Sequence, residues 1–301
     1  MRYPKGPLTV WQQLQQLADR GLIIGDRDYA KRVLLNVGYY RMSGYWWSLQ
    51  EDKTGHRFRE NATFEQAVKL YKFDRELRQV CAHALERIEV SVRTKLKYYP
   101  SIEFTPWWFE DQTLFRNPAH YRSNLKHIED EVNRSKEDFI EHHRQKYAGD
   151  QRLPPAWKTL EVISFGTLSK LYKSLSKGAA AKTIARELGL PNQKYLASWL
   201  QVFTILRNVC AHHSRFWNRL LRKPPKVFRP GSKDWMEYPS HDPKRMYISI
   251  CCMVYALRHI TDDDSVELDL KQLFEDYGED VMPTAVGFPL NWREDPFWAN
   301  R

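Results

Sequence analysis

The stretch between Asn61 and Pro100 constrains the fold most, because it contains no glycine or proline and favours one long helix. Thr63 and Gln66 have the spacing of a capping box at its start. Apolar residues then recur at steps of three and four, as on one buried helix face: Leu70, Phe73, Leu77, Val80, Ala84, Ile88 and Val92. The opposite face is expected to carry Arg75, Arg78, Glu86, Arg87, Arg93 and Lys95. We predict a helix of about 35 residues.

The rest of the chain also has helical periodicity, and no alternating run bounded by hairpin turns stands out. Thr9 and Asp26 are suitable N-caps for two short helices near the start. Later helices are expected after Gly166, from Asn192 into the low 220s, and over residues 243–260 and 266–277. The predicted class is all-α. An N-terminal helical extension over residues 1–60 and a helical domain over residues 61–301 are expected to form one continuous body.

Several features indicate a cytoplasmic protein that meets no membrane. The first residues lack the apolar core of a secretory signal. The longest uncharged apolar run, Met246 to Leu257, is shorter than the roughly 20 residues that a membrane span needs. The cysteines show no C-x-x-C spacing, so we expect them to fill the core rather than hold zinc. They are Cys81, Cys210, Cys251 and Cys252.

Charge is distributed unevenly along the chain. The net charge of +10 over 301 residues is typical of a protein that meets a polyanion such as nucleic acid. Seven lysines and arginines and no acidic residue lie between Arg207 and Pro230. The stretch from Asp262 to Asp280 instead holds nine acidic residues and one lysine, a net charge of −8, which leaves +18 on the rest of the chain. The acidic stretch is therefore a candidate for shielding the basic one.

Residues 206–219, LRNVCAHHSRFWNR, hold the densest set of chemically capable side chains. If the predicted helix continues through them, one polar stripe about 60° wide contains Asn208, His212, Arg215 and Arg219. Asn208 is then placed to hydrogen-bond the His212 imidazole and fix its tautomer. The apolar face of the same helix would comprise Val202, Leu206, Val209, Phe216 and Leu220, and Trp217 is expected in the core.

These residue types suit cleavage of an RNA phosphodiester. The reaction needs a proton taken from the 2′-hydroxyl, a proton given to the leaving oxygen, and neutralisation of charge on the phosphate. A histidine can move the protons, and an arginine can hold the phosphate through two hydrogen bonds. DNA lacks the internal nucleophile, so the substrate would be RNA. We expect no metal or other cofactor, because no cluster of acidic residues suited to magnesium stands out nearby.

The segment RNVCAHHSRFWNR resembles the signature of the Abi-like abortive-infection proteins of the AbiD/AbiF type, a branch of the HEPN superfamily. The hallmark of that superfamily is an arginine, a polar residue and a histidine a few positions further on, which here are Arg207, Asn208 and His212. Four further blocks resemble the family in the expected order, so that the resemblance covers about residues 10–260. These blocks are GLIIGDRDYAKRVLLNVGYYRMSGYWWSL, TFEQAVKLYKFDRELRQV, ERIEVSVRTKLKYY and PPAWKTLEVISFGTLSKLY.

The resemblance implies an all-α HEPN-type bundle that acts as a metal-independent endoribonuclease toxin in bacterial anti-phage defence. It also implies a symmetric homodimer with one composite cleft. In that cleft His212 would act as general base or acid, Arg207 would clamp the scissile phosphate, and Asn208 would orient His212. The expected RNA-binding residues are His213, Arg215, Arg219 and Arg222, and His213 is also a candidate second proton shuttle.

Several alternatives stay open at this point. The sequence RQVCAH from Arg78 to His83 is close to RNVCAH, and is either a chance similarity or a second motif that would let a monomer cut RNA. The chain could instead be a non-catalytic regulator or toxin–antitoxin component that binds a structured noncoding RNA, or a module that binds an acidic protein. A toxic nuclease also needs restraint, from the acidic stretch, a noncoding RNA or a separate antitoxin.

Overall fold

The computed structural model describes residues 6–176, 178–227, 235–237 and 242–299. The all-α prediction is confirmed, since this part of the chain contains fourteen α-helices, several short 3-10 helices and only one small sheet. The sheet is an antiparallel hairpin that the sequence analysis did not predict. Its strands are β1 (Gln50–Asp52) and β2 (Arg57–Phe58), with Gln50 opposite Phe58.

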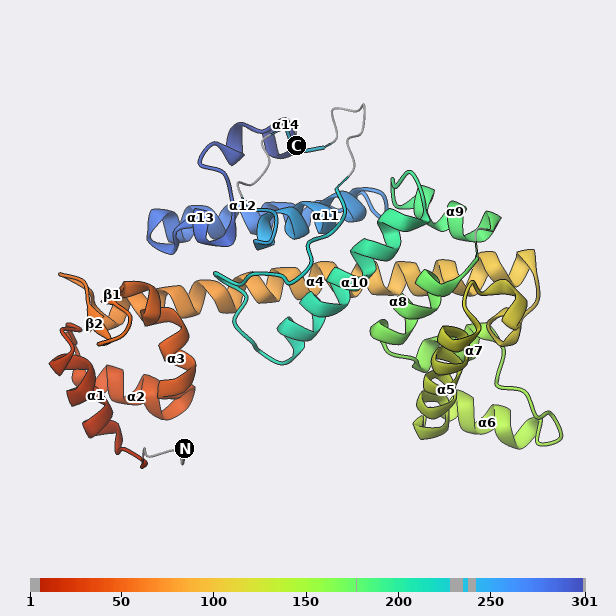
Figure 1. Ribbon diagram of the computed structural model, residues 1–301, viewed down its shortest axis with the longest axis horizontal. Coiled ribbons are helices and arrows are strands. Elements are labelled where there is room, and N and C mark those ends of the chain that lie inside the picture. The colour runs from red at the N-terminus through yellow and green to blue at the C-terminus, as the bar shows by residue number, and fades with distance from the viewer. Residues whose placement is uncertain (1–5, 177, 228–234, 238–241, 300–301) are drawn as a thin grey trace.

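The long predicted helix is α4 (Phe64–Glu103), which has 40 residues and forms the spine of the molecule (Figure 1). The predicted capping box is confirmed, because the Thr63 hydroxyl accepts from the Gln66 amide at 3.1 Å and the Gln66 side chain accepts from the Thr63 amide at 3.1 Å. The helix does not stop at Pro100, which is buried within the last turn. A proline there forfeits one backbone hydrogen bond, and its fixed φ is compatible with the helix.

The predicted buried stripe of α4 is confirmed in most positions, whereas two arginines assigned to its solvated face are not exposed. Arg78 and Arg93 are both buried. Each is held by a carboxylate one turn earlier on the same helix, Asp74 for Arg78 and Glu89 for Arg93. An arginine can be buried when its charge is paired and its N–H groups are satisfied, which periodicity alone does not predict.

At the N-terminal end of α4 lies a small helical layer with the hairpin. It comprises α1 (Val10–Asp19), α2 (Arg27–Val37), α3 (Tyr39–Trp46) and the 3-10 helix η1 (Trp47–Leu49). Both predicted N-caps are present: Thr9 forms a capping box with Gln12, and Asp26 Oδ1 accepts from the Tyr29 amide at 2.8 Å. Helix α3 packs on α4 through buried Tyr45 and Trp46, and so joins this layer to the spine.

Beside the other end of α4 lies a second group of helices. It comprises η2 (Trp108–Glu110), η3 (Gln112–Leu114), α5 (Pro118–Arg134), α6 (Asp138–Lys146), α7 (Ala156–Val162), α8 (Phe165–Ser174) and α9 (Ala179–Glu187). Helices α7 and α9 pack on α4, while α5 and α6 lie further from the spine (Figure 1).

The last group begins with α10, which crosses the spine, and continues on the far side of it (Figure 1). Its elements are α10 (Gln193–Ala211), α11 (Met246–Arg258), α12 (Ser265–Tyr277), η4 (Gly278–Val281), α13 (Pro283–Val286), η5 (Trp292–Glu294) and α14 (Pro296–Ala299). Every residue of α11 from Met246 to Leu257 is buried, so the apolar run of the sequence is a core helix. None of the described helices combines the length and apolarity that crossing a membrane requires. All four cysteines are buried and unpaired, as predicted.

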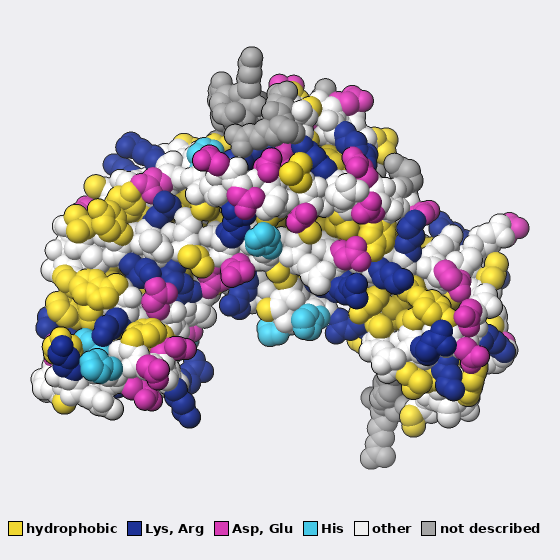
Figure 2. Space-filling model, turned by 180° about the vertical axis from the view of Figure 1, so that it is seen from behind, with side chains coloured by type: hydrophobic (Ala, Val, Ile, Leu, Met, Phe, Trp, Pro, Cys, Tyr) yellow, Lys and Arg dark blue, Asp and Glu magenta, His cyan; other side chains and the backbone are white. Residues whose placement is uncertain are grey.

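The molecule has the shape of an arch. The α1–α3 layer and the α5–α8 group form two legs, and the C-terminal end of α10 projects between them (Figure 1). Figure 2 shows the hollow along this edge from behind, with histidine side chains near its middle.

Candidate functional site

The helix that carries the predicted catalytic residues is shorter than expected. Helix α10 ends at Ala211 rather than in the low 220s, and His212 is its C-cap. Three backbone hydrogen bonds close the end: His212 N to Asn208 O at 2.9 Å, His213 N to Cys210 O at 3.0 Å and Ser214 N to Val209 O at 2.9 Å. His213 has φ +54°, the left-handed conformation that usually follows such a helix end and that usually falls to glycine. No glycine marked the turn in the sequence, and for that reason the prediction was wrong.

Because the helix ends there, the predicted four-residue polar stripe does not form. Arg215 turns away and donates to the Gly44 carbonyl of α3, and Arg219 Nε donates to the Arg215 carbonyl at 2.7 Å. Leu220, expected on the apolar face, is 55% exposed, whereas Phe216 and Trp217 are buried as predicted. The exposed residues of the predicted site are therefore Arg207, Asn208, His212, His213 and Arg222.

A buried carboxylate holds the turn in place. Asp74 of α4 is fully buried, and its oxygens accept from the Tyr45 hydroxyl at 2.6 Å and from the Phe216 amide at 3.0 Å. It also accepts from the Trp217 amide and from the Arg78 guanidinium. Arg78 in turn donates to the Ser214 carbonyl at 3.3 Å. Asp74 thus ties α3, α4 and the segment after α10 together around one charge.

Helix α3 adds a second attachment to the turn. Arg41 donates to the His213 carbonyl, while Arg215 reaches back to Gly44 on the same helix. The N-terminal layer therefore fixes the turn that presents His212 and His213.

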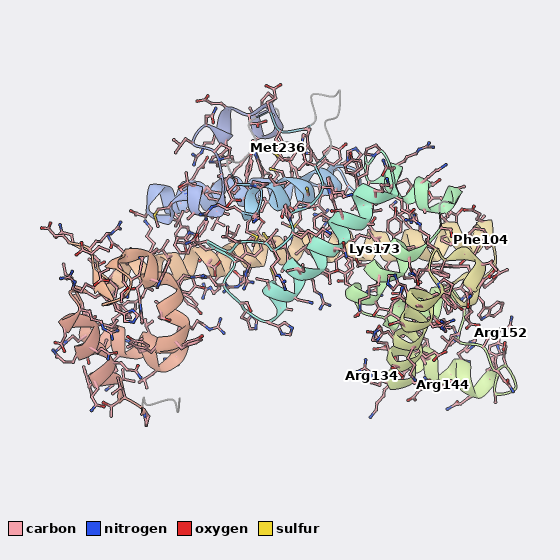
Figure 3. The ribbon with its side chains drawn as sticks, viewed as in Figure 1. Phe104, Arg134, Arg144, Arg152, Lys173 and Met236 are labelled. Carbon is pink, nitrogen blue, oxygen red and sulfur yellow. The ribbon has the colours of Figure 1, made fainter. Side chains whose placement is uncertain are left out.

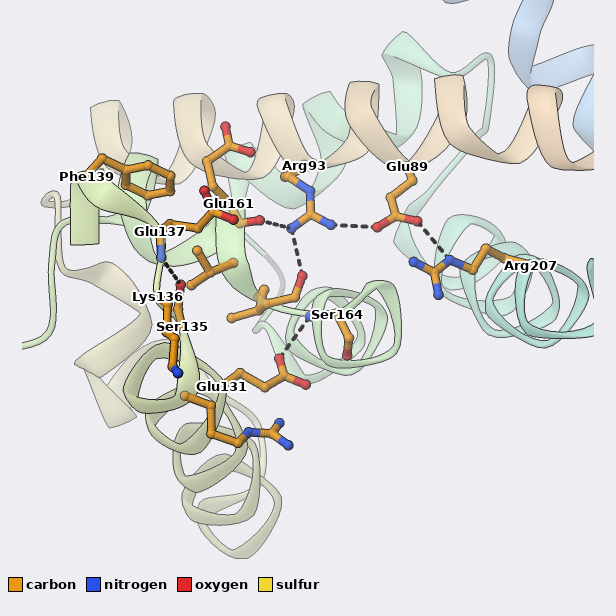
Figure 4. A pocket seen from close by; sticks show the side chains of 13 residues that line it. Glu89, Arg93, Glu131, Ser135, Lys136, Glu137, Phe139, Glu161, Ser164 and Arg207 are labelled. Carbon is orange, nitrogen blue, oxygen red and sulfur yellow. Dashed lines mark hydrogen bonds and ion pairs between the residues drawn. The ribbon is translucent and has the colours of Figure 1, made fainter. Parts of the chain in front are cut away.

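Arg207 faces a different part of the molecule. Its Nε lies 3.5 Å from Oε2 of Glu89 on α4, and the other oxygen of Glu89 lies 2.6 Å from Arg93 (Figure 4). Buried Arg93 also donates to the Ile163 carbonyl at 2.8 Å and to the Leu160 carbonyl, both at the C-terminal end of α7. The Arg207 side chain keeps 45% of its surface exposed, so it is oriented by Glu89 while remaining accessible.

The Arg207 side chain lines an open groove with a volume of about 810 Å³. Glu131, Arg134 and Lys136, from α5 and the turn that follows, also line this groove, and Figure 4 shows Glu131 and Lys136 across from Arg207. Glu131 accepts from the Ser164 amide at 2.9 Å, which fixes α5 to the start of α8. The sequence analysis did not name Glu89 and assigned Arg93 only to the solvated face of the helix, although their four-residue spacing is that of a helical ion pair.

Arg207 and His212 point in different directions from one chain. Five residues of α-helix separate the two by about 140° around the axis, whereas Asn208 and His212 are only about 40° apart. The His212 amide donates to the Asn208 carbonyl. In the described structure no hydrogen bond joins the Asn208 and His212 side chains, which the sequence analysis had expected. A single chain therefore presents a His212 face and an Arg207 face that diverge.

The RQVCAH segment of α4 has a structural role. Arg78 is 5% exposed and bonded to Asp74, whereas His83 is exposed. This favours the interpretation of a chance similarity over a second motif. Burial raises the pKa of the Cys210 thiol to about 12, and raises that of Cys81 well above its ordinary value, so neither offers a thiolate nucleophile.

The acidic stretch packs on the spine rather than over the basic segment. Helix α12 lies against α4, and the ion pairs of this stretch reach Lys69, Arg87 and Arg258. Within the described residues no ion pair joins it to Arg207–Val227. The described part of the chain also contains no group of three or more histidine, cysteine, aspartate or glutamate side chains placed to hold a metal ion.

The family model described as Abi-like protein matches residues 32–218, which run from within α2 through α10 and the turn at His212 and His213. No curated protein and no solved structure matches the chain.

Proposed function

The chain belongs to the Abi-like protein family, and from this premise we propose that it is a HEPN-type endoribonuclease of abortive-infection defence, with its active cleft at the C-terminal end of α10. One observation supports this role above the others. Arg207, Asn208 and His212 are exposed close to a turn whose backbone is bonded to a buried aspartate and to helix α3. A catalytic group has to be accessible and well placed, and here the three side chains are accessible, the turn is anchored, and Glu89 directs Arg207.

In the proposed reaction His212 takes the proton from the 2′-hydroxyl, whose oxygen attacks the adjacent phosphorus. The bond from phosphorus to the 5′-oxygen breaks, and a protonated histidine gives that oxygen its proton. The products are a cyclic 2′,3′-phosphate and a free 5′-hydroxyl. Arg207 neutralises the phosphate oxygens, and Glu89 keeps its guanidinium directed. Asn208 lies beside His212 on the same helix face and contacts the ribose or phosphate.

The divergence of Arg207 and His212 supports a composite cleft made by two copies of the chain. A two-fold axis near the end of α10 would bring the exposed faces of two helices together, because such an interface uses the same surface of both protomers. The hollow between the two legs of the arch leaves room on this edge (Figure 2). The cleft would then hold two copies of His212 and two of Arg207.

The test is cleavage of single-stranded RNA by the purified protein in the presence of EDTA, with the ends analysed for cyclic phosphate. His212→Ala is expected to abolish cleavage, while the matched control His127→Ala, an exposed histidine on α5, cleaves like the wild type. His83→Ala is expected to behave like the control, and its inactivity would revive the second motif. Equal cleavage by His212→Ala and the wild type sinks the proposal.

Subunit mixing tests the composite cleft separately. If two His212 side chains act together, a ninefold excess of His212→Ala protein leaves about one tenth of the wild-type chains paired with each other, and activity falls about tenfold. If each protomer acts alone, the excess changes nothing.

The second candidate function is that of a non-catalytic regulator that binds RNA. A toxin–antitoxin component that binds a structured noncoding RNA belongs to the same class. The pairing of Arg207 with Glu89 favours it, because that arginine is already partly neutralised. This role predicts salt-sensitive RNA binding that survives His212→Ala, with no cleavage of any RNA tested.

A further inference from the structure

A second basic site lies near the N-terminal half of α10. It is a pocket of about 190 Å³ whose lining contains five cationic residues and no carboxylate. The cations come from four separate segments: Arg116 before α5, Lys173 in α8, Lys194 in α10, and Lys223 and Lys226 after the turn. Figure 3 labels Lys173 where α8 approaches α10. The tertiary structure thus gathers like charges that are far apart in the sequence.

The fold holds these charges together without neutralising them. Lys226 is tied to α10, since its amide donates to Ser198 Oγ at 3.0 Å and its carbonyl accepts from Trp199 Nε1 at 2.9 Å. Arg116 donates to the Gln193 side chain, which is neutral. In the described structure none of the five cations forms an ion pair with a carboxylate, and all four lysines are exposed. Clustered like charges repel one another, and an anionic ligand relieves that repulsion.

The pocket lies on the same helix face as His212. Steps of three and four residues along α10 connect Lys194, Ser198, Gln201, Ile205, Asn208 and His212. All of these residues are exposed or half-buried. The distance along the axis from Ser198 to His212 is roughly 20 Å at the helical rise of 1.5 Å per residue. A continuous solvent-facing track therefore runs from the basic pocket to the proposed catalytic end.

We propose that this pocket binds backbone phosphates of the RNA strand whose scissile phosphate lies at His212, an inference that rests on the proposed function. Cations gathered in one pocket with hydroxyl and amide side chains suit a phosphate backbone. A protein partner usually binds through large apolar or aromatic side chains, for which this lining offers no apolar pocket. The exposed Ile205 lies midway along the track and offers a surface for a base. The pocket thus selects strands long enough to reach it.

The first measurement is RNA binding in the His212→Ala background, with a fluorescent dodecanucleotide that is not cut. Lys173→Gln combined with Lys194→Gln is expected to weaken binding about tenfold at physiological salt and to reduce the slope of log affinity against log salt by about 1.4, at 0.7 for each lost phosphate contact. The matched control combines Lys72→Gln with Lys146→Gln, which removes the same charge from exposed positions on α4 and α6. Equal affinity of the two double variants overturns the inference and points to an acidic protein as the ligand.

The second measurement is cleavage with His212 intact. The pocket variant is expected to lower kcat/KM about tenfold for the dodecanucleotide and to leave it unchanged for a dinucleotide, which cannot span roughly 20 Å. An equal loss on both substrates overturns the inference. If the wild type cuts neither RNA while binding still depends on the two lysines, the proposed catalysis fails and the pocket remains an RNA-binding site.

Discussion

Replacing Asp74 by alanine is expected to cost about 5 kcal/mol of folding stability. The carboxylate is fully buried and accepts from four donors: the Tyr45 hydroxyl, the Arg78 guanidinium and the amides of Phe216 and Trp217. Without it the buried guanidinium keeps an uncompensated charge, which costs about 3 to 5 kcal/mol. Two buried amides also lose their acceptor, at a cost of about 1 to 3 kcal/mol each. Water that enters the site and relaxation of the surrounding structure reduce the total cost.

The measurement is urea unfolding followed by circular dichroism, with the free energy of unfolding taken from the midpoint and slope. Asp74→Asn should cost less, since the amide oxygen can still accept from the two backbone groups. Asp269→Ala, an exposed aspartate on α12, is the matched control and should change stability by no more than about 0.5 kcal/mol.

Arg78→Met separates the ion pair from the anchoring of the turn. After this substitution Asp74 still accepts from the Tyr45 hydroxyl and from two backbone amides. Arg78→Met should therefore lower the free energy of unfolding by less than Asp74→Ala does. A cost below about 1 kcal/mol for Asp74→Ala would refute the view that this carboxylate organises the turn. So would a larger cost for Arg78→Met, because the guanidinium would then be the main attachment.

Three further outcomes are expected. Thr63→Ala removes the cap of α4 and should lower the free energy of unfolding by about 1 kcal/mol in the same urea assay. Gly189→Ala should lower the free energy of unfolding by more than about 1 kcal/mol, because φ is +72° and the new Cβ would lie 2.4 Å from His259 Nε2. The control Gly149→Ala, at a position with open space around it, should be near neutral. Equal effects of the two variants would contradict this prediction. Burial raises the pKa of Cys210 to about 12, so iodoacetamide at pH 8 should label the native protein far more slowly than the urea-unfolded one; rapid native labelling would contradict the buried assignment.

Much of the fold follows from local rules and was predictable from the sequence. The start of α4 was identified through Thr63 and Gln66, because a capping box depends on residues only three apart. Helices α11 and α12 lie within a few residues of their predicted ranges. The burial of Cys81 and Cys210 followed from their place among apolar residues.

The candidate site was predicted in part. Arg207, Asn208, His212 and His213, which the sequence analysis assigned to the site, lie exposed in and just after the last turns of α10, while Val209 and Cys210 between them are buried. Asp74 escaped notice, although its position within the apolar stripe of α4, one turn before Arg78, was the available signal. When an ion pair lies within a buried helix face, its remaining donor and acceptor atoms need hydrogen-bond partners from other segments of the fold.

The sequence by itself determined the helical class, the caps and the position of the Arg207 to His212 segment, because each depends on residues within a few positions of one another. Only the tertiary structure decided where α10 ends. His213 adopts a left-handed conformation there, although nothing in its local sequence requires one. Asp74 and Arg41 make that conformation possible from helices far away in the chain. The basic pocket has the same origin, since four distant segments bring their charges together only when the chain has folded.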